Sequence, residues 1–251
     1  MNEVKAKLGM DHPSTLISMA NLASTYWDQG KWDKAEKLQV DVVNGFKEKL
    51  GLNHPDTLII MVNLAATYRN QGRWDEAVKL EVEVMNTSIA KLGSGHPDTL
   101  TSMTNLGASY RNLGRWDEAE KLQVNAINGL KLKYESDHPD TLTAMNELAL
   151  TYSKQGRWDE AERLQMYVMN ARKVKLGSKH PDTLTAINNL AYMYHNQGRW
   201  EEAEKLQVDV VDSFKERLGM DHPSTLNSMA HLASTYCTTI RKNGMKLRSC
   251  R

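Results

Sequence analysis

The dipeptide His-Pro recurs along this chain at a fixed interval of 42 residues, and this period constrains the fold more than any other feature. The copies begin at His12, His54, His96, His138, His180 and His222. All six prolines of the 251-residue chain lie in these pairs, with no insertion or deletion between them. Because units of equal length can stack on one another in the same way, the period predicts a solenoid rather than a globular domain with one central core.

Each unit carries the signals of two helices joined by a glycine. In the second unit, Pro55 suits the first turn of a helix and Gly72 suits its end, while Trp74 opens a second helix that Gly93 ends. Apolar residues recur between these signals at helical spacing, as in Leu58, Met61, Leu64, Ala65 and Tyr68 and then Ala77, Leu80 and Val84. The predicted helices are about 17 and about 18 residues long, and neither can bury its apolar stripe unless neighbours stack on it.

The units together predict an all-α solenoid of helix-turn-helix repeats. Five full hairpins and a sixth first helix account for residues 1–236, where "VKAKLG" near the start matches the end of a second helix. Residues 237–251 match no part of the repeat and carry basic residues without an acid, so we expect a disordered tail. We expect the tryptophans that open the second helices to pack between helices, and Trp27 to be exposed. The former are Trp32, Trp74, Trp116, Trp158 and Trp200.

The residues of one unit resemble a known repeat family. The pattern L-A-x-x-Y, then Gly, then W-D-E-A resembles the tetratricopeptide repeat, although its usual period is 34 residues. The longer form, with "HPDTL", "NNLA" and "GRWDEAEKL", resembles the repeats of kinesin light chain and of the sensor arrays of fungal NLR-like ATPases. The resemblance covers about residues 6–236. It implies a right-handed superhelix whose first helices line a concave groove that binds peptides.

Composition and motifs speak against catalysis, cofactors and metals. With 32 basic and 31 acidic residues, the chain has no strong field to attract nucleic acid or a membrane. It has no phosphate-binding G-x-x-x-x-G-K-[ST] loop. The His-Pro histidines lie in successive units, too far apart to share one metal ion, whereas His195 and His231 break the pattern and contact either solvent or a ligand. Both cysteines lie in the tail, which fits a reducing compartment and predicts a cytoplasmic protein.

The resemblance also assigns candidate groove residues. In related repeats the residue before the Leu of "NLA" hydrogen-bonds the main chain of a bound peptide, and an Asn suits this because it both donates and accepts. This position and the end of the same helix supply the predicted clamp, made of Asn21, Asn63, Asn105, Asn189, Asn70, Asn112 and Asn196. Variable neighbours in the fourth and fifth units are expected to set specificity, namely Glu147, Leu150, Lys154 and Tyr192. The alternative is that these amides cap or bridge neighbouring helices.

The sequence therefore predicts a non-catalytic scaffold that binds a protein or an extended, mostly neutral peptide. Two alternatives stay open. The chain could be a detached ligand-sensing repeat domain of a fungal NLR-like ATPase, or a self-assembling structural array. For the array, the last helix would expose Leu226, Met229 and Leu232 and support weak end-to-end association.

Overall fold

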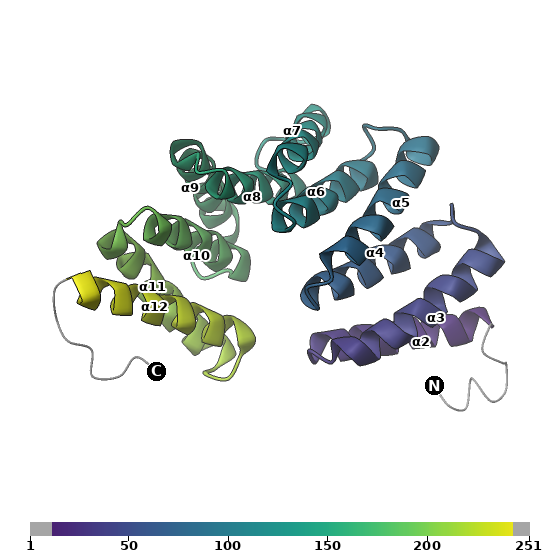
Figure 1. Ribbon diagram of the computed structural model, residues 1–251, viewed down its shortest axis with the longest axis horizontal. Coiled ribbons are helices and arrows are strands. Elements are labelled where there is room, and N and C mark those ends of the chain that lie inside the picture. The colour runs from purple at the N-terminus through teal and green to yellow at the C-terminus, as the bar shows by residue number, and fades with distance from the viewer. Residues whose placement is uncertain (1–11, 243–251) are drawn as a thin grey trace. The chain divides into compact units, whose positions relative to one another are not determined.

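A computed structural model describes residues 12–242, which form eleven helices joined by short turns (Figure 1). First and second helices alternate as the period predicts, with 16 residues in α2 and 19 residues in α3. The helices are α2 (Pro13–Asp28), α3 (Trp32–Leu50), α4 (Pro55–Asn70), α5 (Trp74–Leu92), α6 (Pro97–Asn112), α7 (Trp116–Lys133), α8 (Pro139–Lys154), α9 (Trp158–Leu176), α10 (Pro181–Asn196), α11 (Trp200–Leu218) and α12 (Pro223–Lys242). The matched segment "VKAKLG" lies outside the described residues.

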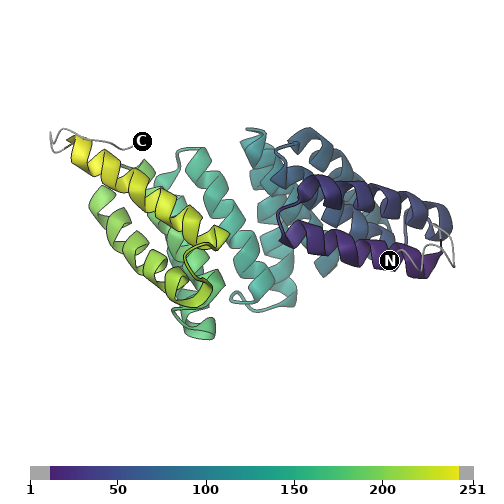
Figure 2. The ribbon, with the colours of Figure 1, turned by 90° about the horizontal axis from the view of Figure 1, so that it is seen from below.

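The chain divides into two compact units, residues 1–130 and residues 131–251. In the first unit, helices α2 to α6 pack in chain order: α2 on α3, α3 on α4, α4 on α5 and α5 on α6. In the second unit, α8, α9, α10, α11 and α12 do the same, and both views show these helices side by side (Figures 1 and 2). Packing between sequence neighbours confirms a solenoid of helix hairpins.

Each first helix begins with a histidine cap. The His54 ring accepts, at Nδ1, a hydrogen bond of 3.3 Å from the backbone N–H of Asp56, and His96, His138 and His180 repeat this contact. Pro55 follows at the first helical position, where its missing N–H leaves no bond unmade. The histidine imitates the Asn or Ser usually found at this position, since its ring nitrogen satisfies one of the unpaired N–H groups of the first turn. The sequence predicted a structural role for these histidines without identifying the cap.

Glycines with positive φ end the first helices, and the absence of one extends α12. Gly72 has φ of 75° and follows Tyr68 by four residues, as Gly198 follows Tyr194. After Tyr236 that position holds Ile240, and α12 continues to Lys242. Residues 237–242, which were expected to belong to a disordered tail, therefore continue the helix instead. Residues 243–251 of the predicted tail lie outside the described residues.

Alanines are more deeply buried between the helices than tryptophans. The recurring alanines of the second helices are completely buried, and they are Ala35, Ala77, Ala119, Ala161 and Ala203. The tryptophan row was also expected to pack between helices; Trp32 is 38% exposed and Trp116 is 40% exposed, whereas Trp74, Trp158 and Trp200 are half-buried. Each Trp opens its helix three residues before the buried Ala, so its ring lies at the edge of the hairpin. The expectation that Trp27 is exposed is confirmed.

Candidate functional site

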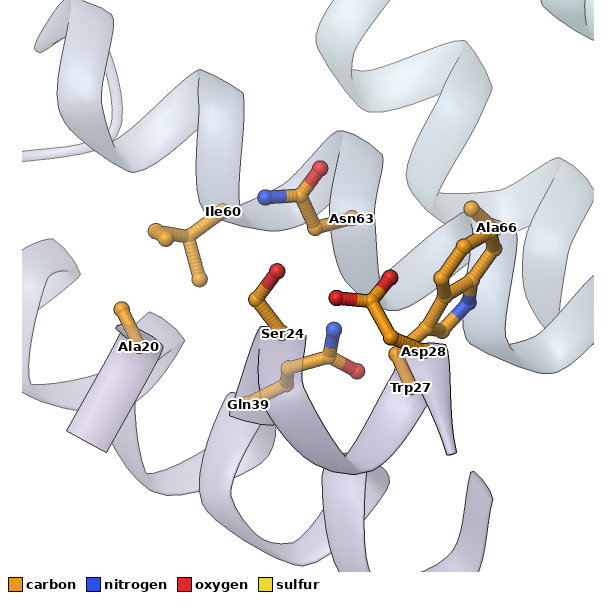
Figure 3. Close-up of a pocket in the computed structure, with 8 residues that line it drawn as sticks. All are labelled: Ala20, Ser24, Trp27, Asp28, Gln39, Ile60, Asn63 and Ala66. Atoms are coloured by element: carbon orange, nitrogen blue, oxygen red, sulfur yellow. The ribbon is translucent and has the colours of Figure 1, made fainter. Parts of the chain in front are cut away.

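A cavity of about 290 Å³ lies between the first helices α2 and α4. Figure 3 shows polar groups from both helices around it: the amide of Asn63, the hydroxyl of Ser24 and the carboxylate of Asp28. Gln39 reaches the same space from α3, and Trp27 forms one wall. This cavity can therefore hold a polar group that donates to a carboxylate and pairs with amides.

Gln39 presents donors to this cavity. Its Oε1 accepts a hydrogen bond of 2.7 Å from the buried hydroxyl of Thr67, which leaves the side-chain N–H groups for the cavity. Gln39 was not among the predicted site residues. Its signal was present in the sequence as the recurring "KLQ" or "RLQ" of the second helices, at Gln39, Gln123, Gln165 and Gln207.

A second cavity, of about 330 Å³, lies between α4, α5 and α6 and is mostly apolar. Leu58, Val62 and Leu92 supply apolar walls, and Asn63 and Asn105 lie on its lining. Asn63 therefore borders both cavities. The structure brings together two of the predicted clamp residues, at a place where an apolar pocket adjoins a polar one.

The clamp amides Asn21, Asn63 and Asn105 of the first unit are uncommitted. Asn21 and Asn63 are exposed and Asn105 is half-buried, and none of the three makes a side-chain hydrogen bond within residues 12–242. Asn70 is exposed at the end of α4, and Asn112 donates to the carbonyl of Ala108 in its own helix at 2.9 Å. Asn63 and Asn105 can thus both donate to and accept from an added main chain without breaking a bond.

In the second compact unit, residues 131–251, the amide at the equivalent repeat position bridges two helices. Asn189 Nδ2 on α10 donates to Asn146 Oδ1 on α8 at 2.9 Å. The same oxygen accepts from Gln165 Nε2 at 3.1 Å, and Gln165 also donates to the carbonyl of Ala186 at 3.0 Å. Asn189 therefore follows the alternative interpretation, in which the amide bridges neighbouring helices.

The preceding first helix explains this difference. Asn189 meets a residue 43 positions earlier in the chain, Asn146, which offers an acceptor. For Asn63 and Asn105 the residues at the same offset are Ala20 and Val62, which have no polar side-chain atom. The same amide position is thus committed or uncommitted according to one neighbour.

The predicted specificity residues lie in the same unit, and two of them contact each other. The Lys154 ammonium lies 3.4 Å from the Tyr192 hydroxyl and 5.6 Å from the centre of its ring. The Asn196 amide and Lys154 together lower the pKa of Tyr192. Glu147 accepts from Asn146 at 3.4 Å, and Leu150 packs against a buried cluster that contains Met193.

His195 and His231 link α10 to α12. His195 Nδ1 lies 3.1 Å from the Thr235 hydroxyl, and His231 Nδ1 lies 3.3 Å from the Asn188 amide nitrogen. Burial, with the nearby His195, lowers the pKa of His231. Within residues 12–242 no group of three or more His, Cys, Asp or Glu side chains could hold a metal ion.

In one repeat, a glutamate replaces the buried glutamine of the second helix. Glu81 of α5 stands where Gln39 stands in α3, and its side chain is only 4% exposed. Burial raises its pKa to about 7, while Arg69, whose Nη1 lies 3.4 Å from Glu81 Oε1, acts in the opposite direction. The first unit therefore holds a buried group that titrates near neutral pH.

Comparisons with known proteins agree with this architecture. The tetratricopeptide repeat family matches residues 14–90, 56–122, 98–173 and 183–224. Among solved structures, a variant of a kinesin light chain protein of Podospora anserina with nearly identical repeats shares 31% identity. The match covers 82% of this chain and 97% of that chain, with a TM-score of 0.65. None of the curated proteins matches the chain.

Two more distant structures share the fold. NprR in complex with its cognate peptide NprX is 15% identical over 98% of this chain and 67% of that chain, with a TM-score of 0.70. A signal transduction ATPase with a tetratricopeptide repeat sensor, from Pyrococcus horikoshii, is 15% identical over 98% of this chain and 36% of that chain, with a TM-score of 0.63.

The chain belongs to the tetratricopeptide repeat family. Its 42-residue period and its similarity to the Podospora anserina protein place it with the kinesin-light-chain-like members of that family. The tetratricopeptide repeat is a scaffold fold. Within residues 12–242, none of the helices combines the length and the apolar character needed to cross a membrane.

Proposed function

We propose that the chain is a non-catalytic scaffold that binds an extended peptide, or an extended segment of a protein, along α2, α4 and α6. The observation that carries this proposal is the uncommitted amide of Asn63 at the border of two cavities of different chemistry. An extended ligand would pair its main chain with Asn63 and Asn105. It would place one apolar side chain in the 330 Å³ cavity and a polar or basic one beside Asp28.

The ligand chemistry follows from the lining. The walls at Leu58, Val62 and Leu92 favour an aliphatic or aromatic side chain, because burying it removes apolar surface from water. The Asp28 carboxylate favours a donor at the neighbouring subsite. In this proposal Lys154 and Tyr192 would set specificity only if their mutual contact opened, so the first unit supplies most of the recognition. Cytoplasmic localisation stays a prediction.

The proposal can be tested by selecting peptides from a random library on the full chain and measuring their affinity for variants. Asn63→Ala should lower the affinity for a selected peptide several-fold, since one lost hydrogen bond costs about 0.5–1.5 kcal/mol. Asn44→Ala, at an exposed position of α3 that lines neither cavity, is the matched control and should leave binding unchanged. Equal affinity for the wild type and the Asn63 variant would reject the groove as the binding site.

A ligand-sensing repeat domain of a larger ATPase would use the same groove. A protein that assembles only with itself would instead yield no selected peptide whose affinity depends on Asn63. The selection therefore separates the scaffold from the self-assembling array.

A further inference from the structure

The first and last described helices have almost the same sequence but different surroundings. From His12 to Tyr26 and from His222 to Tyr236, the sequences differ only at Ile17/Asn227 and Asn21/His231. The apolar residues that pack α2 against its neighbour are therefore all present in α12. Any difference in their exposure comes from what packs on each helix, not from its sequence.

In α2 these residues are covered by α3. Leu16 and Met19 are each 2% exposed and share a cluster with Val42, Val43 and Phe46 of α3. The tip of Leu16 fits against Gly45, where an added Cβ would lie 2.7 Å from Leu16 Cδ2. A first helix of this sequence thus selects a second helix with a glycine opposite its leucine.

In α12 no second helix from residues 12–242 covers the same residues. Leu226, the equivalent of Leu16, is 52% exposed, and Ala233 is exposed while Ala23 is buried. The opposite side of α12 is buried through Thr225, Ser228 and Thr235, and α12 packs on α11. The helix is therefore docked on one side and open on the side that receives a second helix in every complete hairpin.

A tyrosine at the end of the helix adds a charge preference. In the other hairpins the equivalent tyrosine lies under a cation: Lys34 over Tyr26 at 5.6 Å, Arg73 over Tyr68 at 4.4 Å and Arg199 over Tyr194 at 4.0 Å. Tyr236 is 39% exposed and has no such cation among the described side chains of residues 12–241. A helix that covers α12 therefore gains from a basic residue near its start.

We propose that the open face of α12 binds, in trans, an amphipathic helix of the second-helix type from a different protein chain. That helix would carry a basic residue and Trp near its start, Ala three residues after the Trp, and a glycine opposite Leu226. A second copy of this chain is disfavoured as occupant, because its α3 is already covered by α2. Exchanging α2 for α12 would expose as much apolar surface as it buries. This site is separate from the groove proposed above.

The test uses α3 itself as the probe. A fluorescent peptide of residues Lys31–Leu50 should bind the full chain saturably in an anisotropy titration and gain helicity on binding, since an isolated helix of this length is marginal in water. Leu226→Arg should weaken binding at least about ten-fold. Asn227→Arg changes a neighbouring exposed residue, and its equivalent in α2, Ile17, is exposed rather than buried against α3. This variant should leave binding unchanged. Thermal melts establish that both variants stay folded.

The peptide supplies a second, independent control. Gly45→Leu raises the intrinsic helicity of the peptide, so it should help any non-specific helix contact, yet it fills the notch opposite Leu226 and should abolish specific binding. Equal binding by the two peptides, no binding at all, or insensitivity to Leu226→Arg would overturn the proposal. Self-association of the chain that Leu226→Arg abolishes would also overturn it, by assigning the face to a second copy. The groove variant Asn63→Ala should leave α3-peptide binding unchanged, so this result and that of the groove proposal are distinguishable.

Discussion

The amides of the first and second compact units occupy the same repeat position but differ in whether they hydrogen-bond to a neighbouring helix. Asn63 and Asn105 are uncommitted beside cavities, whereas Asn189 is held by Asn146 on the preceding first helix. The cause is the residue one repeat earlier on the facing helix: Ala20 and Val62 in one case, Asn146 in the other. A recurring residue thus identifies a position in the fold, and its neighbour in the adjacent repeat decides whether it is available to a ligand.

The largest expected effect on stability comes from changing Glu81. The other second helices carry a buried glutamine at this repeat position, and only α5, in the first compact unit, has a carboxyl there. Its pKa in the folded chain is about 7, above the unfolded value of 4.5, so its deprotonation opposes folding. The stabilising contribution of protonated Glu81 is complete below about pH 4.5 and is lost as the pH rises through about 7. Glu81→Gln should therefore raise the stability at pH 8 by about 2–3 kcal/mol and have little effect at pH 5.

Urea unfolding at pH 5, 7 and 8 measures this effect. Glu83→Gln changes a partly exposed carboxylate of α5, the helix that also carries Glu81, and this carboxylate is paired with Lys47 of α3. It is the control and should shift stability by less than about 1 kcal/mol. A Glu81→Gln variant whose advantage is the same at every pH would show that the buried carboxyl does not titrate in this range.

The double variant Asn63→Ala with Asn105→Ala should lower the affinity for a selected peptide roughly ten-fold or more, since each lost amide contact costs about 0.5–1.5 kcal/mol. The unfolding midpoint should stay the same because neither side chain has a partner to lose. Calorimetric titration gives the affinity. If the double variant bound as well as the wild type but unfolded more easily, the two amides would be structural.

Val62→Asn should give Asn105 the kind of polar neighbour that Asn189 has in residues 131–251. The new side chain would offer Asn105 the acceptor that Asn146 offers Asn189, so Asn105 would turn from the ligand to its neighbour. Peptide affinity should fall several-fold while stability rises by about 0.5–1.5 kcal/mol. Val62→Ala, which removes apolar wall without adding an acceptor, separates this effect from loss of the cavity lining. Affinity that falls equally in both variants would mean that only the apolar surface matters.

Asn189→Ala should have the smallest effect on function. It removes one donor from Asn146, which still accepts from Gln165, so stability should fall by only about 1 kcal/mol. The affinity of a selected peptide should not change. Chemical unfolding and a binding titration on the same sample are sufficient, and a clear loss of affinity would place a ligand on the second unit.

The sequence predicted the fold well because the fold depends on local, repeated signals. Pro55, Gly72 and the buried Ala77 each act within one hairpin, so a single unit already defines them. The prediction failed for α12 where a local signal was lost, because Ile240 replaces the glycine that ends the other first helices. It also failed for Trp32 and Trp116, which are exposed, since periodicity does not reveal which side of a helix end meets solvent.

The candidate site was harder to predict because it depends on contacts between units. The repeat position gave Asn63, Asn105 and Asn189 the same role, and only the pairing of Asn189 with Asn146 separates them. That pairing joins residues 43 positions apart, one more than the period, so comparing equivalent positions does not show it. The border of two cavities at Asn63 was likewise not predicted, because five helices, α2 to α6, line these cavities.

The central claim is that the first-unit amides are available to a ligand and the second-unit amide is not. The direct measurement is a ¹⁵N NMR titration of the side-chain NH₂ groups with a selected peptide, assigned with single Asn→Ala variants. The account predicts that the Asn63 and Asn105 signals shift with the peptide concentration while the Asn189 signal stays in place. A titration in which Asn189 shifts and Asn63 does not would contradict it.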